Sequence, residues 1–280
     1  MIASTPTSLL ARHKLPHWLA GISCALLASG AAAASFEIAA TPSLFELSGK
    51  GGARIGQSIT IYNVGNAPTD LTMRTLDWTF SPEGEVSYHD ALLDGSCRPW
   101  VTLERHQVRV NPRGNTLFRF QVQIPADAPR GECRFMVALE GTEPAQMAVI
   151  KSKGASMRLP VSGRIAIPVY LATNGAQPKL EAQATSLRTV QGRQMVALTV
   201  HNSGDAHGRI HGSLEAVDAQ GSKHELFPEG GPILPGQTRT LLLNPQPQAG
   251  KPAPALTLPV RLKGTLEWEL GGFKIDTVLQ

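Results

Sequence analysis

MRLPVSGRIAIPVYL, residues 157–171, is the stretch that decides the fold. Its apolar side chains alternate with a mixed set, and only Gly163 interrupts the apolar series. A period of two is typical of an extended strand with one apolar face. Fifteen residues predict a single strand that outruns its own sheet, because strands usually have about five or six. Pro160 and Pro168 cannot donate ladder hydrogen bonds, so we expect this strand at a sheet edge or at a crossing between domains. A long apolar edge strand invites pairing with another chain.

Residues 1–34 have the pattern of a secretory signal. Arg12 and Lys14 precede an apolar run at residues 18–27 that is too short to cross a bilayer, and four alanines at residues 31–34 offer a cleavage site. Cys24 lies inside this segment, and the residues before it are not those of a lipoprotein signal. No later stretch is long and apolar enough for a membrane anchor. We therefore expect an exported, soluble protein with no membrane anchor.

The charge balance gives little support for a nucleic-acid partner. The chain has 26 Lys and Arg against 22 Asp and Glu. Removing the signal takes away Arg12 and Lys14 and no acidic residue, which leaves 24 basic residues and a net charge of +2. No basic block with interleaved aromatic residues is present, so no nucleic-acid role is predicted. The carboxylates are scattered, and neither GxSxG nor HExxH occurs. We predict that the protein is not an enzyme and uses no cofactor.

Two cysteines remain after the signal, Cys97 and Cys133. In an oxidising compartment we predict that they form a disulfide. Closing a loop of 36 residues should stabilise the fold by about 3 to 4 kcal/mol on the chain-entropy model. A catalytic or metal-binding thiol is disfavoured, because no CxxC motif exists and no His or Asp pattern accompanies either cysteine.

From residue 35 onward, short alternating segments are separated by turn signals. No stretch of ten or more residues has a convincing helical period, so the sequence predicts an all-β fold. Residues 141–154 lie between two strands and are predicted to form a loop. Strands are expected in the first half at residues 36–47 with a break at Pro42, and at 57–62, 70–78, 99–110, 116–124 and 133–139.

The second half of the chain repeats markers of the first. ITIYNVGNA at residues 59–67 resembles LTVHNSGDA at 198–206, and VNPRG at 110–114 is echoed by ILPGQ at 233–237. Two markers in the same order predict two immunoglobulin-like β-sandwich domains. The predicted division is an N-terminal domain at residues 35–171, a linker at 172–179 and a C-terminal sandwich at 180–280.

Three histidines, His201, His207 and His211, cluster beside Asp205. One interpretation is a metal site. The other is a hairpin in which His201 ends a strand, His207 lies in the turn and His211 begins the next strand. Gly204 disfavours the helix that would align His207 with His211, so we favour the hairpin and predict no metal.

Two segments carry a resemblance to a known family. SGRIAIPVY at residues 162–170 is similar to the basic-hydrophobic-x-hydrophobic-x-x-Tyr pattern that ends the first domain of the periplasmic chaperones of the chaperone–usher pathway, which assemble pili on Gram-negative surfaces. The motif PxxFxL at residues 42–47, before a strand that ends in Asn63, fits the layout of the same family. The resemblance extends across most of the mature chain as a layout of two sandwiches.

The resemblance implies a function and a location. In this family, alternating apolar residues just upstream of the pattern pair with an unfinished pilin or fimbrial subunit, and Met157, Leu159 and Val161 occupy those positions here. The implied protein is a periplasmic chaperone that captures such subunits by β-augmentation and delivers them to an outer-membrane usher. A client groove would receive both the ladder partners and the apolar side chains of the donated strand.

The chain departs from the family in its basic residues. The family usually anchors the carboxyl end of the subunit with two basic residues, one from the first strand and one from the closing strand. The first strand here offers Thr41, Pro42 and Ser43 and no cation. In the closing strand, the position is Arg164 in one register and Ala166 in the other. The pair of cysteines is also not a general family feature, so the chain resembles a divergent member.

A different class of protein explains many of the same features. A secreted two-domain sandwich with a structural or adhesive role would also be exported and all-β. It leaves the overlong apolar edge strand without a purpose. Neighbouring usher and pilin genes would separate the two interpretations.

Overall fold

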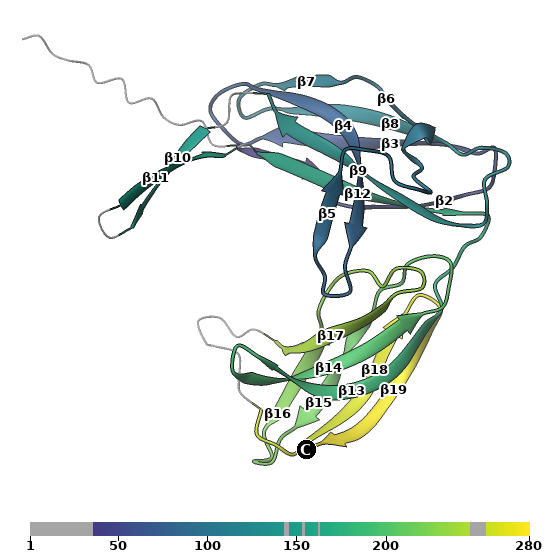
Figure 1. Ribbon diagram of the computed structural model, residues 1–280, viewed down its shortest axis with the longest axis vertical. Helices are drawn as coiled ribbons and strands as arrows, with labels where there is room; N and C mark the ends of the chain where they lie inside the picture. The colour runs from purple at the N-terminus through teal and green to yellow at the C-terminus, as the bar shows by residue number, and fades with distance from the viewer. Residues whose placement is uncertain (1–35, 143–145, 153–154, 162, 247–255) are drawn as a thin grey trace, which may run out of the picture. The chain divides into compact units, whose positions relative to one another are not determined.

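The computed structural model describes residues 36–142, 146–152, 155–161, 163–246 and 256–280. Within these ranges every regular element is a strand except one short 3-10 turn, η1 (Arg98–Trp100), which confirms the all-β prediction (Figure 1). The described part of the chain contains no helix of the length and hydropathy needed to cross a membrane. Residues 34–280 belong to one compact unit.

Two sheets form the first sandwich. One sheet has the order β1-β3-β8-β6, and the other has the order β2-β12-β9-β4-β5, with β7 paired to β4. The strands of the first sheet are β1 (Ile38–Thr41), β3 (Arg54–Asn63), β8 (Asn115–Gln123) and β6 (Val101–Leu103). Those of the second are β2 (Phe45–Gly49), β12 (Arg164–Thr173), β9 (Gly131–Gly141), β4 (Thr69–Phe80), β5 (Val86–His89) and β7 (Gln107–Val110).

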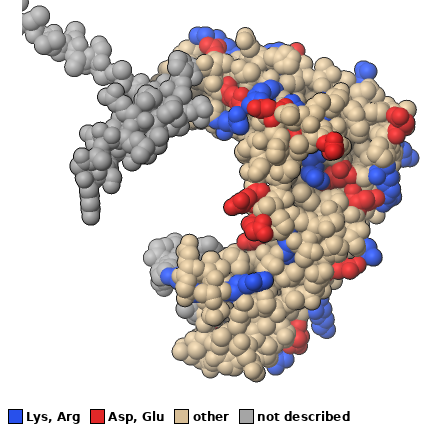
Figure 2. Space-filling view, in the orientation of Figure 1, with Lys and Arg blue, Asp and Glu red and all other residues tan. Residues whose placement is uncertain are grey.

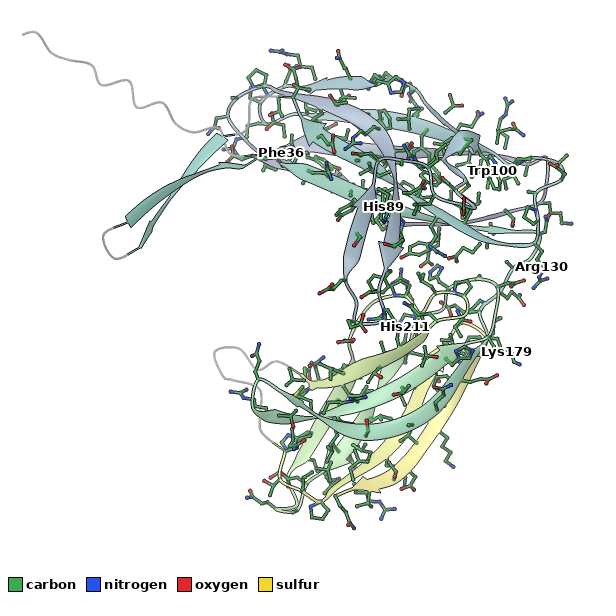
Figure 3. The ribbon with its side chains drawn as sticks, in the orientation of Figure 1. Phe36, His89, Trp100, Arg130, Lys179 and His211 are labelled. Carbon is green, nitrogen blue, oxygen red and sulfur yellow. A yellow bond between two sulfur atoms is a disulfide. The ribbon has the colours of Figure 1, made fainter. Side chains whose placement is uncertain are left out.

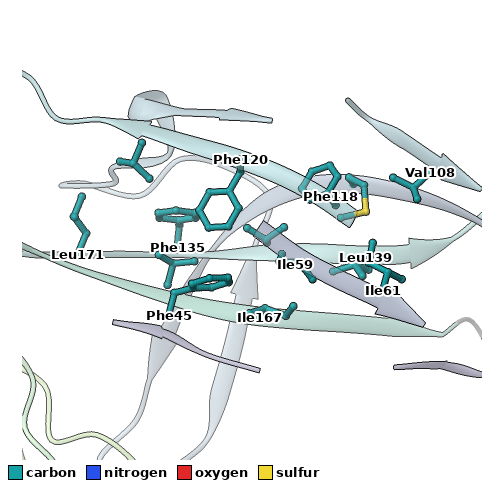
Figure 4. Packing of buried hydrophobic residues seen from close by; sticks show 14 of the residues in the cluster. Phe45, Ile59, Ile61, Val108, Phe118, Phe120, Phe135, Leu139, Ile167 and Leu171 are labelled. Carbon is teal, nitrogen blue, oxygen red and sulfur yellow. The ribbon is translucent and has the colours of Figure 1, made fainter. Parts of the chain in front are cut away.

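The inward-facing residues of both sheets form one apolar core. Phe120 of β8 lies between two other phenylalanines, with ring centroids 5.2 Å from Phe45 and 6.2 Å from Phe135, and both contacts are edge-to-face (Figure 4). Aromatic rings prefer this geometry because the positive edge of one ring meets the negative face of the other. Ile59 and Ile61, two residues apart on β3, are fully buried in the same core. Alternation in the sequence therefore marks the true inner face of the strand.

The second sandwich is a single curled sheet of seven strands. The strand order is β13-β14-β17-β16-β15-β18-β19, and side chains from all seven strands meet in one core. Leu198, Leu214, Leu226 and Leu262 are fully buried there. The strands are β13 (Leu180–Val190), β14 (Arg193–Asn202), β15 (His211–Val217), β16 (Lys223–Pro228), β17 (Thr238–Pro245), β18 (Val260–Trp268) and β19 (Gly271–Leu279).

The repeated sequence marker folds in the same way in both sandwiches. Asn63 ends β3, and its buried side-chain amide donates to the carbonyl oxygens of Ala67 at 2.7 Å and Val110 at 3.1 Å. Asn202 ends β14, and its amide donates to the carbonyls of Ala206 and Ile233, both at 2.8 Å. In each case the side-chain oxygen accepts from the backbone two residues later, at 2.9 Å. In each sandwich the repeated asparagine therefore holds the turn after its strand, β3 or β14, against a segment far along the chain.

The prediction of one continuous strand over residues 157–171 is wrong. The structure has two strands there, β11 (Ala155–Val161) and β12 (Arg164–Thr173). The reason lies at Gly163, where an added Cβ would stand only 1.8 Å from Cγ of Phe36. The Phe36 ring covers the backbone at this point, and the Gly163 carbonyl accepts from the Gly141 N–H at 3.2 Å.

The predicted loop at residues 141–154 is also wrong in part. The strand β9 continues to Gly141, and β10 (Gln146–Ser152) is a strand that pairs antiparallel with β11. Its flanks, Glu143-Pro144 and Lys151-Ser152-Lys153-Gly154, carry the turn signals on which the loop prediction rested, whereas residues 147–150 are apolar. The apolar run at residues 147–150 fits a strand, and the structure supplies its partner, β11.

The predicted break at Pro42 is confirmed, and Pro168 lies at a sheet edge as predicted. The chain leaves one sheet and enters the other at Pro42, because β1 pairs with β3 whereas β2 pairs with β12. The strand β12 pairs with β9 along its full length but with β2 only from Val169 onward. Pro168 is thus the last residue of the stretch in which β12 is a sheet edge, as expected for a residue without an N–H.

Candidate functional site

The strands β10 and β11 form a two-stranded hairpin that pairs with no other strand of the described residues. In Figure 1 they lie outside both layers of the first sandwich. The register places Gln146 opposite Val161, Ala148 opposite Leu159 and Ile150 opposite Met157. The sequence-predicted row of Met157, Leu159 and Val161 thus lies on β11, and the outer edge of β11 carries backbone N–H and C=O groups with no partner in a described strand. Such an edge is a template for another strand.

The base of this hairpin is fixed to the first sandwich. Phe36 lies beside it, and the ring approaches both glycines where the two strands leave the sheet: an added Cβ would be 3.4 Å from the ring at Gly141 and 1.8 Å at Gly163 (Figure 3). Directly after Gly163, β12 pairs with β9 over ten positions, from Arg164 opposite Glu140 to Thr173 opposite Gly131. The strand β11 is therefore attached through a few residues to a well-paired strand.

Arg164 lies at this base and is held by a carboxylate. Its Nε is 2.5 Å from Oε1 of Glu140, and its guanidinium lies 5.8 Å from the centre of the Tyr88 ring. Glu140 also binds Arg74 of β4 in a two-point contact, with 2.8 Å from Nε to Oε2 and 2.8 Å from Nη2 to Oε1. One carboxylate therefore holds two arginines from two different strands.

A second carboxylate completes the group. Asp90, just after β5, accepts a hydrogen bond from Nη1 of Arg74. This hydrogen bond lowers the pKa of the Asp90 carboxyl, and Arg164 and Arg98 lower it further through their charge. The hydrogen bond from Arg74 likewise lowers the pKa of Glu140, although partial burial opposes the effect. Both carboxylates raise the pKa of Arg74 through hydrogen bonds and charge. Figure 2 shows basic and acidic side chains interleaved on the visible face of the first sandwich.

The alternative register position, Ala166, has a different environment. It pairs with Ala138 and packs at the border of an apolar cluster that includes Trp78, Met136 and Tyr170. The cluster is aromatic, with the Trp78 and Tyr170 rings edge-to-face at 5.6 Å. At the first strand, Thr41 pairs with Thr60 at the end of β1, so the structure places no cation at that position. Arg164 and Ala166 therefore lie on one face of β12, but only Arg164 belongs to the charged group.

The three histidines of the sequence cluster separate in the fold. Nδ1 of His201 lies 2.9 Å from Oγ1 of Thr238, and His211 is exposed at the start of β15. His207 instead meets two carboxylates of the first sandwich, with Nδ1 at 2.5 Å from Glu132 Oε2 and Nε2 at 3.3 Å from Glu46 Oε1. The described residues contain no group of three or more His, Cys, Asp or Glu arranged to hold a metal.

The predicted disulfide is present. Cys97 and Cys133 are bonded, with their Cα atoms 5.8 Å apart. The bond ties the segment before η1 to the start of β9, the strand that supports both β12 and β4.

Sequence reasoning missed Arg74, Asp90, Glu140 and Tyr88. Arg74 and Glu140 come from neighbouring strands, and Asp90 belongs to a turn, so no local spacing joins them. One signal was available: on β4, Thr72, Arg74, Leu76 and Trp78 have the same parity, which puts an arginine on the outer face beside β9. The partners could be found only from the register between strands.

The fold is similar to solved structures of chaperones. No protein-family profile matches the chain, and no curated protein matches it in sequence. The YadV chaperone is 12% identical, with a TM-score of 0.45 over 87% of this chain and 100% of that one. The CsuC–CsuE chaperone–tip adhesion subunit complex of the archaic chaperone–usher Csu pili of Acinetobacter baumannii gives 13% and 0.42, over 86% and 97%. The SafB chaperone with the SafA pilin of Salmonella enterica gives 14% and 0.40, over 88% and 96%.

Proposed function

We propose that this protein is a periplasmic chaperone that binds pilin or fimbrial subunits by donating the edge strand Met157 to Val161. The observation that carries the proposal is the outer edge of β11, which has no partner among the described strands. Monomeric proteins usually cover, shorten or charge such an edge. Here the edge has seven residues and an alternating apolar row, Met157, Leu159 and Val161.

The chemistry of binding follows from strand geometry. A subunit that lacks one strand exposes unpaired backbone groups and an apolar groove, and β11 supplies ladder partners and apolar side chains together. Three side chains that bury ~100 Å² each contribute on the order of 7 kcal/mol at about 25 cal/mol/Å², before the costs of association. Backbone pairing adds affinity, while the alternation fixes which face enters the groove.

The hairpin context supports this role. β10 pairs with β11 over seven positions, so the donor strand is already extended before a client arrives. Pre-organisation of this kind reduces the conformational entropy that binding costs. The strand also continues into β12, which is paired throughout with β9. In this proposal Arg164, at the junction, sets how far the client strand can slide.

The proposal includes a location and partners. The signal pattern at residues 1–34 fits export to the periplasm, and the disulfide between Cys97 and Cys133 fits an oxidising compartment. The clients are pilin or fimbrial subunits, and the acceptor of the complex is an outer-membrane usher. Capture and release need no bond to be made or broken, so the role is that of a binding protein and not of an enzyme.

The test is a charge placed in the donor row. We expect Leu159→Glu or Val161→Glu to abolish capture of a pilin or fimbrial subunit, because the client groove would have to desolvate the carboxylate. Arg158→Glu, on the same strand with opposite parity, is the matched control and should retain capture. Co-purification after co-expression measures capture, and thermal melting of each purified variant measures folding.

The outcomes separate three interpretations. Loss of capture with an unchanged melting temperature supports strand donation. A large fall in melting temperature for both glutamate variants would mean that Leu159 and Val161 belong to a core, since a buried carboxylate destabilises by several kcal/mol. If no variant, nor the wild type, binds a pilin subunit, the protein is instead a secreted structural or adhesive sandwich.

A further inference from the structure

His207 is a buried histidine that the proposed function does not use. It lies in the segment between β14 and β15, and 8% of its side chain is exposed. Its ring stacks on the ring of Tyr170 of β12, with the centroids 4.0 Å apart and the planes inclined at 32°. Stacking fixes the orientation of the imidazole, so the direction in which each ring nitrogen points is also fixed.

Both ring nitrogens of His207 face a carboxylate. Nδ1 is 2.5 Å from Oε2 of Glu132 on β9, and the same oxygen accepts the backbone N–H of His207 at 2.8 Å. Nε2 is 3.3 Å from Oε1 of Glu46 on β2. An ionised carboxylate only accepts hydrogen bonds, and a neutral imidazole has a single N–H. Only the protonated ring can therefore donate to both carboxylates at once.

The two carboxylates differ in their access to water. The Glu132 side chain is 1% exposed, whereas that of Glu46 is 49% exposed. A neutral His207 should keep its proton on Nδ1, because a bare Nδ1 would turn a lone pair toward a buried carboxylate. Nε2 would then carry the lone pair, and two acceptors would meet where Nε2 faces Glu46. Glu46 can leave this contact, because half of its side chain already reaches water.

An arginine also holds each of these carboxylates. Nη1 of Arg134 on β9 is 3.2 Å from Oε1 of Glu132. Nε of Arg209 is 3.1 Å from Oε1 of Glu46. Two cations and two carboxylates balance before the histidine is counted, so the hydrogen-bond geometry of the two ring nitrogens decides what protonation does.

The other groups near the ring leave this assignment intact. Burial raises the pKa of Tyr170, against the opposing charge and hydrogen bond of Arg209, so the stacked ring stays neutral. Burial opposes ionisation of Glu46, but hydrogen bonds from Arg209 and His207 outweigh it and lower the pKa of Glu46. Asp205, two residues before His207, is bound by Arg130.

We propose that His207 is a proton-operated switch: the protonated ring bridges Glu132 and Glu46, and the neutral ring keeps Glu132 and releases Glu46. The proton on Nε2 passes to solvent when the ring becomes neutral. The contact that is kept joins residues 203–210 to β9, and the contact that is released joins them to β2. The link to β2 therefore stabilises the protein at low pH and is lost as the pH rises. This switch needs neither a client nor an usher, so it does not depend on the proposed function.

The first experiment reads the protonation of each ring nitrogen. The full mature protein is labelled with ¹⁵N-histidine, and Nδ1 and Nε2 of His207 are followed by NMR from about pH 5 to about pH 9, with the spectrum of His207→Gln for assignment. We expect both nitrogens to be protonated at the low end and only Nδ1 at the high end. A ring that stays doubly protonated throughout, or a neutral ring with its proton on Nε2, would overturn the proposal.

The second experiment measures stability by thermal melting at about pH 5.5 and about pH 8.5. Relative to the wild type, His207→Gln should lower the melting temperature by about 2 to 4 °C more at the lower pH, which is the shift expected for one hydrogen bond in a protein of this size. His201→Gln is the matched control, because Nδ1 of His201 lies 2.9 Å from the Thr238 hydroxyl oxygen and not from a carboxylate. Its effect should be the same at both pH values.

Glu46→Gln tests the released partner and covers the case in which His207→Gln does not fold. The amide can donate to a neutral Nε2 and accept from a protonated one, so this variant should lose stability mainly at the lower pH. The proposal fails if Glu46→Gln loses as much at pH 8.5 as at pH 5.5. It also fails if His207→Gln and His201→Gln depend on pH to the same degree.

Discussion

Asn202→Ala should remove the side-chain hydrogen bonds that hold the turn after β14. The same pattern of hydrogen bonds occurs at Asn63 in the first sandwich. Asn202 is fully buried, and its side chain makes four hydrogen bonds. Two of them end on buried sites, the carbonyl oxygens of Ala206 and Ile233. The other two begin at the N–H groups of Lys179 and Gly204, which are partly buried and can reach water.

The magnitude follows from the two buried carbonyls. A buried acceptor that loses its partner costs about 1 to 3 kcal/mol. Two such acceptors give an expected loss of about 2 to 6 kcal/mol. Asn63→Ala, the corresponding change in the first sandwich, should cost a comparable amount, since Asn63 binds the buried Val110 carbonyl and the Gly65 N–H.

Equilibrium unfolding in urea, followed by circular dichroism with the disulfide intact, measures both variants. Asn244→Ala is the control, because Asn244 is exposed on β17 and its loss should change the free energy of unfolding by less than about 0.5 kcal/mol. If Asn202→Ala were as mild as Asn244→Ala, the shared hydrogen-bond pattern would not be what holds these turns.

Two further predictions concern the base of the β10–β11 hairpin. Gly163→Ala should destabilise the protein by about 1 to 3 kcal/mol, because the new Cβ displaces the Phe36 ring. In a Phe36→Ala background the same change should cost much less, and additive costs in a double-mutant cycle would refute the steric reason. The second prediction concerns pH. The pKa of Glu140 is lowered in the folded protein, so its ion pairs stabilise the fold fully above the ordinary glutamate pKa of about 4.3. This stabilisation is lost as the pH falls through the lowered pKa of Glu140 in the folded state. Glu140→Gln should therefore be less stable at pH 7 and lose less stability between pH 5 and pH 3 in thermal melts, whereas an equal loss in both proteins would show that the pair with Arg74 does not contribute.

Several features of the fold could be predicted from the sequence because their physical causes are local. Alternation with a period of two gave the strands, since successive side chains of an extended chain point to opposite faces. Pro42 predicted the break in the first strand, because a residue without an N–H interrupts a ladder. The structure adds that the chain changes sheets at this break. Cys97 and Cys133, the two cysteines left in an exported chain, gave the disulfide.

The repeated Asn63 and Asn202 turns are an intermediate case. Their sequence similarity predicted two like domains, and the structure shows the same hydrogen bonds in each. The carbonyls of Val110 and Ile233, which accept from these asparagines, lie far along the chain. The sequence therefore revealed the repeated motif but not the hydrogen bonds that it makes.

Only the tertiary structure decided how residues 157–171 are divided into two strands and which residues surround them. At Gly163, between β11 and β12, the ring of Phe36 leaves no room for a side chain, and Phe36 is distant in sequence. The extended form of β10 comes from pairing with β11. Arg74, Asp90 and Glu140 meet because β4 and β9 pair in one particular register and β5 ends beside them. Local sequence determines whether a segment can be a strand. The strand that pairs with each edge and the ion-pair partners of each charged side chain come from distant segments, which meet only when the chain folds.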